Sequence, residues 1–327
     1  MITINNNMYV LDTDNTSYAF AVLGSGQLEH LYYGRKLHAN EAVMTEKHTF
    51  IPGNTNVYNK DYSSYSLEDV CLEMSSLGKG DIREPFIEVT YPNGSSTTDM
   101  VFDRAEIIQG KEEYDTLPGS YDDNGEVEQL VIYLKDRNYN LTLELHYYVY
   151  EKCDIITRSA KLVNSGNESV RLERLMSMQL DLNESDYELS FFNGAWAREM
   201  NRSRIPIRAG KYVNESVTGT SSNRANPFFM IGRSSTTEDY GECYGFNLIY
   251  SGNHYEAAQV NSYGKLRLVS GINPATFSYI IEAGKCFEAP EAVLTYSYKG
   301  YNRMSHNMHE FVRKHIAVSY THLTLPT

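Results

Sequence analysis

Alternation of apolar and polar side chains with a period of two runs through most of this chain. In the segment 141–150, leucine, tyrosine and valine occupy the odd positions, with Thr142, Glu144 and His146 between them. Such alternation is typical of a strand with one buried face. The same pattern predicts strands at Tyr18–Leu23, Gln129–Lys135, Ile155–Val163, Val170–Leu175, Phe228–Gly232, Gly245–Tyr250, Lys265–Val269, Phe277–Ile281 and Ala292–Tyr298. Helical periodicity is nearly absent before residue 300, so we expect an all-β sandwich or barrel.

Turn signals separate these strands. They are Asn93-Gly94, Asn124-Gly125, Ser165-Gly166-Asn167 and Asn193-Gly194. Asparagine and glycine tolerate the left-handed backbone that tight hairpin turns require. Gly24-Ser25-Gly26 is also interpreted as a hairpin turn, because it is too short to indicate a nucleotide-binding loop.

One amphipathic helix is predicted near the C-terminus. Met304, Met308, Phe311, Val312 and Ile316 recur at spacings of three and four. Ser305 is the expected N-cap, and the basic run 313–315 suits the negative end of the helix dipole. The apolar face needs a surface, either on the sandwich or on a domain that follows. If that domain is missing, we expect the apolar side at Met308, Phe311 and Ile316 to be exposed and to drive association.

Composition excludes some classes of function. The formal net charge of −13 opposes binding to nucleic acid. Cys71, Cys153, Cys243 and Cys286 lie far apart in sequence and predict free thiols rather than a zinc or redox motif. The start, Met1 to Asn7, does not resemble a signal peptide, and no apolar run approaches the roughly 20 residues of a membrane helix. We therefore expect a cytoplasmic protein.

Motifs for catalysis or metal binding are not evident. His306, His309 and His315 share the predicted helix, where a solvated face is favoured over a metal site. A glycosidase needs two carboxylates, and Asp81, Glu84 and Glu88 lie close in sequence. Glu84 and Glu88 would share one face of a strand, but nothing marks either as a catalytic acid. Asp81-Ile82-Arg83 is predicted to form a structural ion pair or to cap a turn.

Trp196 is the only tryptophan, and the chain also holds 27 tyrosines. A single tryptophan is usually a core residue, although an aromatic ring can also stack on the apolar face of a sugar. The tyrosines favour strands, and tyrosine also lines interfaces and sugar-binding surfaces.

An ordered set of short motifs resembles the N-terminal β-sandwich domain of α-galactosidases of glycoside hydrolase family 36. The resemblance extends over about residues 15 to 317. It is carried by Ser17-Tyr18, His30-Leu31-Tyr32-Tyr33-Gly34, Gly78-Lys79-Gly80-Asp81-Ile82-Arg83-Glu84-Pro85, Gly194-Ala195-Trp196-Ala197-Arg198-Glu199, Gly219-Thr220-Ser221-Ser222-Asn223, Asn226-Pro227-Phe228, Gly241-Glu242-Cys243-Tyr244-Gly245-Phe246, Tyr250-Ser251-Gly252-Asn253, Gly271-Ile272-Asn273-Pro274, Pro290-Glu291 and Tyr296-Ser297-Tyr298-Lys299-Gly300.

The resemblance implies a domain organisation. Residues 1–302 would form a large antiparallel two-sheet supersandwich, and residues 303–317 a helix that links it to a (β/α)₈ barrel. The last ten residues, 318–327, resemble a non-native, adapter-derived tail in place of the barrel. Both catalytic aspartates of the family lie on barrel strands, so no catalytic residue is assigned here, and the chain alone is expected to be inactive.

The resemblance also implies a substrate and partners. The whole enzyme would be a retaining exo-α-galactosidase acting on melibiose- or raffinose-type sugars, with no metal or cofactor, and transfer of N-acetylgalactosamine remains the alternative. Trp196 would contact the substrate. In the family tetramer, a loop matching about His48 to Tyr62 enters a neighbouring active site. Here Phe50-Ile51-Pro52-Gly53-Asn54-Thr55-Asn56 stands where better-known members carry a charged pair, and Asn223 stands where histidine is commoner.

Two other classes of function remain open from the sequence. The tyrosine-rich sandwich is compatible with a non-catalytic carbohydrate-binding or adhesion module. It is also compatible with a pure assembly domain that has Trp196 in its core.

Overall fold

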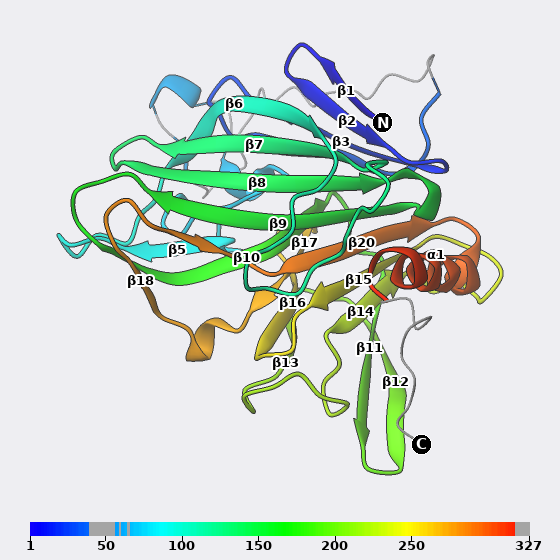
Figure 1. Ribbon diagram of the computed structural model, residues 1–327. Coiled ribbons are helices and arrows are strands. Elements are labelled where there is room, and N and C mark those ends of the chain that lie inside the picture. Colours follow the sequence, from blue (N-terminus) through cyan, green and yellow to red (C-terminus); the bar gives the residue numbers. More distant parts are fainter. Residues whose placement is uncertain (39–55, 59, 64–65, 318–327) are drawn as a thin grey trace.

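The computed structural model describes residues 1–38, 56–58, 60–63 and 66–317 (Figure 1). The expected tail, 318–327, and most of the loop from His48 to Tyr62 lie outside these residues. Within them, strands and a single α-helix form the regular structure, together with four short 3₁₀ helices, η1 (Lys60–Tyr62), η2 (Leu67–Asp69), η3 (Glu151–Cys153) and η4 (Pro274–Thr276). The all-β class with one C-terminal helix is therefore confirmed.

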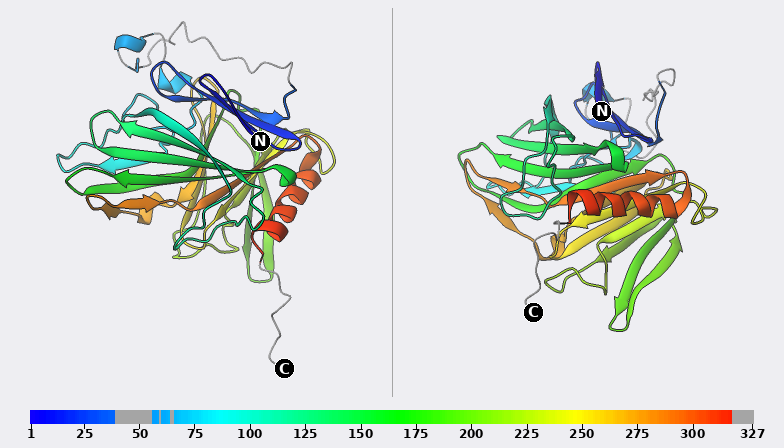
Figure 2. Two further views of the ribbon diagram at one scale, coloured as in Figure 1. Left: turned by 45° about the horizontal axis from the view of Figure 1, so that its top comes forward. Right: turned by 45° about the vertical axis from the view of Figure 1, so that its right-hand side comes forward.

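The N-terminal strands form a separate four-stranded sheet. It is an antiparallel meander of β1 (Ile2–Asn5), β2 (Met8–Asp12), β3 (Thr16–Val22) and β4 (Leu28–Arg35). Figure 2 shows it as a layer at one side of the molecule. The turn between β3 and β4 contains Gly24-Ser25-Gly26, as predicted, and Gly26 adopts a φ of 88°.

The largest sheet has ten strands. Its order is β12-β11-β14-β15-β20-β9-β8-β7-β6, and β19 adds to β9. The bounds are β6 Met100–Gln109, β7 Glu128–Asp136, β8 Leu141–Tyr150, β9 Ile155–Asn164, β11 Glu188–Ala195, β12 Arg198–Pro206, β14 Phe228–Gly232, β15 Cys243–Ile249, β19 Cys286–Glu288 and β20 Glu291–Ser297. In β8 the odd positions are buried and Thr142, Glu144 and His146 are half-buried, as the alternation predicts.

A six-stranded sheet completes the fold. Its order is β13-β16-β17-β10-β18, and β5 also pairs with β10. The bounds are β5 Ile87–Thr90, β10 Val170–Leu182, β13 Gly210–Glu215, β16 His254–Val260, β17 Leu266–Ile272 and β18 Tyr279–Ile281. The strand pairs of all three sheets are antiparallel.

One hydrophobic core connects the sheets. Phe20 of the first sheet, Leu145 of the largest sheet and Leu180 and Leu268 of the six-stranded sheet belong to the same buried cluster. Between its apolar side chains lie buried charges, among them Glu73 and Arg158, with a distance of 3.2 Å between the carboxylate and guanidinium. The expected two-sheet sandwich is thus extended by a third, N-terminal sheet packed on the same core.

The helix α1 (Gly300–His315) docks on the largest sheet, against β15 and β20. Met304 and Phe311 are buried, and the Phe311 ring meets Tyr150 edge-on at 4.9 Å. Met308 and Ile316 are half-buried against the same surface. The predicted exposure of this apolar side is therefore wrong, because the sandwich itself covers it. Within the described residues, no helix is long and apolar enough to cross a membrane.

The predicted N-cap at Ser305 is also wrong. The helix begins at Gly300, whose φ of 75° and close contact with the turn 237–240 leave no room for a side chain. The backbone carbonyls of Thr237 and Glu238 accept from the first free amides, at Tyr301 and Asn302. The basic residues Arg313, Lys314 and His315 do occupy the last turn, as predicted.

Candidate functional site

Trp196 lies at the tip of a β-ribbon formed by β11 and β12. The ribbon projects from the body of the molecule (Figure 1), and the side chain is 92% exposed. Ala197, beside it in the turn, has a φ of 59°, so the tip is a tight connection between the strands. Burying a ring of this size would stabilise a protein by about 4 kcal/mol, taking ~150 Å² at ~25 cal/mol/Å². Trp196 does not provide this stabilisation, because its ring is exposed. The interpretation of Trp196 as a core residue is therefore wrong.

Gly194 fixes the ribbon against the loop that precedes β14. Asn193-Gly194 was predicted to be a turn, but both residues lie within β11, and the turn is two residues later. A Cβ atom at Gly194 would lie 2.8 Å from Glu199 Cα and 2.9 Å from the backbone oxygen of Asn223. Glycine is needed here for close backbone approach, not for a turn.

The loop 216–227 is held by the turn before β16. Gly219 donates its backbone N–H to Asn253 Oδ1 at 2.7 Å, and Ser221 donates to the backbone oxygen of Ser251 at 2.9 Å. These contacts bring together two of the motifs that carry the family resemblance. Asn223 contributes its backbone to the support of the ribbon, and no role for its side chain follows from this geometry.

A buried histidine–glutamate pair lies behind the same loop. His254 and Glu256 are both buried on β16, with 2.9 Å between His254 Nδ1 and Glu256 Oε2. His254 Nε2 lies 3.0 Å from the backbone oxygen of Ala225, and Asn214 donates to Glu256 at 2.9 Å. Burial alone would lower the pKa of His254, but the hydrogen bond and charge of Glu256 outweigh it and raise that pKa. Neither residue was singled out from the sequence, because a pair two residues apart on a strand carries no special motif.

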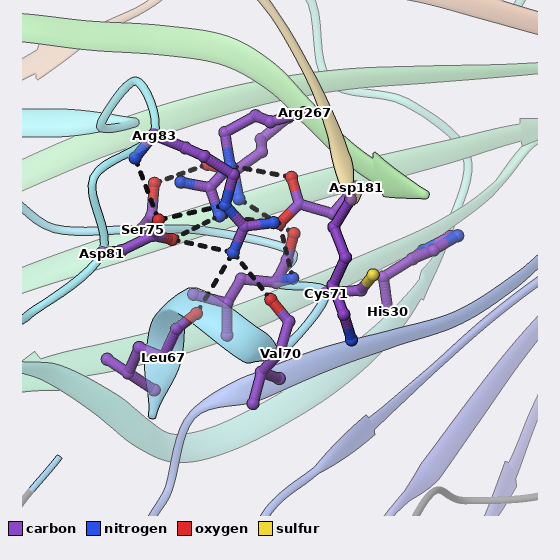
Figure 3. Close-up of polar contacts among 12 residues, drawn as sticks. His30, Leu67, Val70, Cys71, Ser75, Asp81, Arg83, Asp181 and Arg267 are labelled. Atoms are coloured by element: carbon purple, nitrogen blue, oxygen red, sulfur yellow. Dashed lines mark hydrogen bonds and ion pairs between the residues drawn. The ribbon is translucent and has the colours of Figure 1, made fainter. Parts of the chain in front are cut away.

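The carboxylates considered for catalysis are counter-ions of buried arginines. Asp81 lies 2.9 Å from Arg83 and 2.8 Å from Arg267, and Asp181 joins both arginines (Figure 3). Burial would raise the pKa of Asp81, but Arg267 and Arg83 outweigh it and lower that pKa. Arg83 also donates to the backbone oxygens of Leu67 and Val70. The predicted structural ion pair at Asp81 and Arg83 is confirmed.

Glu84 and Glu88 share one partner. Both pair with Arg174, and Glu84 also accepts from Lys211 at 2.6 Å. Burial would raise the pKa of Glu84, but the hydrogen bonds from Lys211 and Arg174 outweigh it and lower that pKa. A carboxylate held ionised in this way is not suited to act as a general acid.

The remaining candidates are placed as follows. The described residues contain no group of three or more metal-ligating side chains. His315 packs on Tyr150 and contacts the backbone oxygen of Tyr121, while His306 and His309 are exposed. In the loop from His48 to Tyr62, the residues Phe50 to Thr55 lie outside the described part. Tyr58 is buried and donates to Asp99 at 2.7 Å, so it anchors the end of this loop.

Comparison with known proteins identifies the family. The model of the glycosyl hydrolase family 36 N-terminal domain matches residues 26–282. Alpha-galactosidase AgaA of Geobacillus stearothermophilus is 36% identical over 313 residues, which cover 94% of this chain and 42% of that protein. The bifunctional alpha-galactosidase/sucrose kinase AgaSK of Mediterraneibacter gnavus is 34% identical, covering 98% of this chain and 34% of that protein.

Solved structures agree with this comparison. The α-galactosidase AgaB from Geobacillus stearothermophilus superposes with a TM-score of 0.94 at 32% identity, covering 98% of this chain and 44% of that one. The galactosidase domain of AgaSK superposes with a TM-score of 0.93 at 32% identity, covering 100% and 46%. The chain thus spans less than half the length of the relatives it matches. It belongs to glycosyl hydrolase family 36 and corresponds to the N-terminal domain of that family's α-galactosidases.

Proposed function

We propose that this domain serves an α-galactosidase that removes terminal α-galactosyl residues from melibiose- or raffinose-type oligosaccharides. The relatives that support this are named α-galactosidases, and structures of AgaA hold raffinose and stachyose. Hydrolysis would proceed by double displacement through a covalent galactosyl-enzyme, without a cofactor. Specificity for N-acetylgalactosamine is the alternative within the same chemistry.

Catalysis would come from a barrel domain that is not part of this chain. A retaining glycosidase needs two carboxyl groups about 5 Å apart, one acting as nucleophile and one as acid and base. The carboxylates considered in this chain, Asp81, Glu84 and Glu88, are held by arginines and lysine. We therefore expect the chain alone to be catalytically silent.

Trp196 would supply part of the wall of the sugar pocket. The observation that carries this proposal is its exposure at the tip of a ribbon whose backbone packs closely on Asn223 at Gly194. The exposed indole ring leaves its flat apolar face available to a ligand. It would stack on the C–H face of a galactosyl unit beside the barrel.

The domain would also mediate assembly. In the proposed cytoplasmic tetramer, the loop from His48 to Tyr62 would reach a neighbouring subunit, anchored at one end by Tyr58. A carbohydrate-binding module that acts without a barrel is the competing function, because an exposed aromatic ring serves such a module equally well. A pure assembly role with Trp196 in the core conflicts with the exposure of that ring.

Two assays separate these functions. The first is turnover of p-nitrophenyl α-galactoside by the purified chain, for which we expect no activity above the uncatalysed rate. The second is titration of Trp196 fluorescence with melibiose, in the chain alone and in the chain joined to a family barrel. A response that requires the barrel supports the enzyme, whereas a full response from the chain alone supports the binding module. Turnover by the chain alone, at a rate proportional to its concentration, would contradict the proposal.

A further inference from the structure

A cavity of about 430 Å³ opens between the first sheet and the ten-stranded sheet. It lies between β4, the residues that follow β10, and the strands β15 and β20. This volume is within the range of roughly 300–1,000 Å³ found for small-molecule sites. Tyr187 lines it just before β11, whereas Trp196 lies just beyond the other end of that strand. Nine residues of strand place the two about 30 Å apart, so the cavity is not part of the Trp196 surface.

Tyrosine rings form a continuous wall of this cavity. The ring of Tyr244 lies 5.6 Å from Tyr33, 5.0 Å from Tyr296 and 6.1 Å from Tyr187, between centroids. Three of the hydroxyls are held in place. Tyr296 donates to Glu242 at 2.8 Å, Tyr187 to Glu184 at 3.3 Å and Tyr244 to the backbone oxygen of Tyr33 at 3.0 Å. The wall therefore offers flat apolar faces in fixed orientations.

His30 brings a buried hydrogen-bond acceptor to the cavity lining. Its side chain lies 2.7 Å from Glu73 through Nδ1, and Glu73 also accepts from the hydroxyls of Tyr18 and Tyr147. Because a carboxylate only accepts, Nδ1 carries a proton, and in the neutral tautomer with this proton Nε2 presents a lone pair. Among the described residues Nε2 has no hydrogen-bond partner, although His30 is 5% exposed. Figure 3 shows His30 turned away from the ion cluster of Arg83 and Asp181. An O–H donor that enters the cavity, from water or from a bound molecule, would satisfy Nε2.

Most charges of the cavity are already paired; among the described residues the exception is Arg35, whose guanidinium stacks 4.2 Å from the centroid of the Tyr298 ring. Arg233 joins Glu184 and lies 3.9 Å from Glu242, and its guanidinium stacks 4.2 Å from the centroid of Tyr187. Asp181 is neutralised by Arg83 and Arg267. An anionic ligand would meet the carboxylates of Glu184 and Glu242, whose partner Arg233 is already engaged. The ligand that fits is neutral, rich in hydroxyls and apolar on one face.

We propose that this cavity is a second saccharide site, which binds a neutral mono- or disaccharide with one hydroxyl donating to His30 Nε2. It is distinct from the proposed sugar contact of Trp196 and can exist whether or not that contact does. A site of this kind would hold substrate or product on the domain while a galactosyl unit is processed elsewhere.

The test uses the chain with Trp196→Ala, so that the ribbon contributes nothing. Adding Tyr32→Trp places the chain's only tryptophan in the wall of the cavity, because Tyr32 lines it and is half-buried. We expect melibiose to change the fluorescence of this tryptophan with saturation in the millimolar range. His30→Phe in the same background should weaken binding at least tenfold, and His306→Phe, on an exposed face of α1, should leave it unchanged.

A measurement on the unsubstituted chain covers the case in which His30→Phe does not fold. With ¹⁵N-labelled histidine, melibiose should shift the resonance of His30 Nε2 in the direction of an accepted hydrogen bond. If melibiose changes neither this resonance nor the cavity fluorescence, the cavity holds water only and the proposal is wrong. A melibiose-induced shift of the His30 resonance that disappears with Trp196→Ala would place binding at the ribbon and would overturn the proposal too.

Discussion

Replacing Glu256 by glutamine should remove a pH dependence of stability that the buried His254–Glu256 pair creates. His254 Nε2 lies 3.0 Å from the backbone oxygen of Ala225, which only accepts, so Nε2 carries a proton. The contact of 2.9 Å between Nδ1 and Glu256 then requires one further proton, shared by the two side chains. The folded pair holds this proton because the pKa of His254 is raised.

The size and sign of the effect follow from this proton. Between the ordinary glutamate pKa of about 4.3 and the ordinary histidine pKa of about 6.5, the folded and unfolded chains bind the same number of protons at these two groups. Above the histidine value the unfolded imidazole loses its proton while the folded pair keeps it. The free energy of unfolding should therefore fall with rising pH, by at most about 1.4 kcal/mol per pH unit. The contribution is complete below pH ~6.5 and is lost as the pH passes the raised pKa of His254.

Glutamine and alanine at position 256 should differ sharply. The glutamine side-chain amide can donate to a neutral His254 and still accept from Asn214, so Glu256→Gln should cost less than about 1.5 kcal/mol. Glu256→Ala removes the hydrogen-bond partner of both His254 and Asn214 and should cost about 3–5 kcal/mol. Urea denaturation of all three proteins from pH 5.5 to 8.5 measures this, with hydrogen exchange of residues 216–227 as the local readout. If the wild-type and Glu256→Gln curves stay parallel above pH 6.5, the shared proton does not exist.

Three further outcomes test the geometry. Gly194→Ala should destabilise the chain by about 1–3 kcal/mol in the same denaturation assay, because its Cβ would collide with backbone on two sides. Gly24→Ala is the control and should have little effect, because the nearest atom to its Cβ lies 3.6 Å away. Trp196→Ala should change the free energy of unfolding by no more than about 0.5 kcal/mol, because the side chain is exposed, and a larger loss would show that the ribbon packs elsewhere. A thiol reagent should rapidly modify one cysteine of the folded chain, the exposed Cys286. The other three should react slowly, because burial raises the pKa of Cys71 and Cys243 to about 12 and that of Cys153 to about 11. Rapid modification of all four would contradict this burial.

The fold was largely predictable because turn signals separate short β-forming segments, although central strands such as β9, β10 and β20 are buried on both faces rather than one. The segments predicted at Leu141–Tyr150 and Phe228–Gly232 match β8 and β14 residue for residue. The prediction missed strands such as β12 and β13, whose residues are exposed or half-buried throughout and carry no apolar alternation. It also missed β1, β2 and β4 of the N-terminal sheet, so the third sheet could not be foreseen.

The site was harder to predict because burial is a tertiary property. The position of Trp196 in the sequence does not distinguish a core ring from a projecting one, and only the ribbon geometry decides. Charged side chains such as Glu73 and Arg158 are normally interpreted as surface residues, although here they lie within the core. The helix start was misplaced because its first amides are capped by a distant turn at Thr237, which no local motif reveals.

The most direct test is the Michaelis constant of a chimeric enzyme. Residues 1–317 of this chain would be joined to the part of AgaA that follows its matched region, and turnover of p-nitrophenyl α-galactoside would be measured with and without Trp196→Ala. We predict an active chimera in which this substitution raises KM at least tenfold while the fold is unchanged. An unchanged KM and kcat in the Trp196→Ala chimera would show that the ring does not contact the substrate.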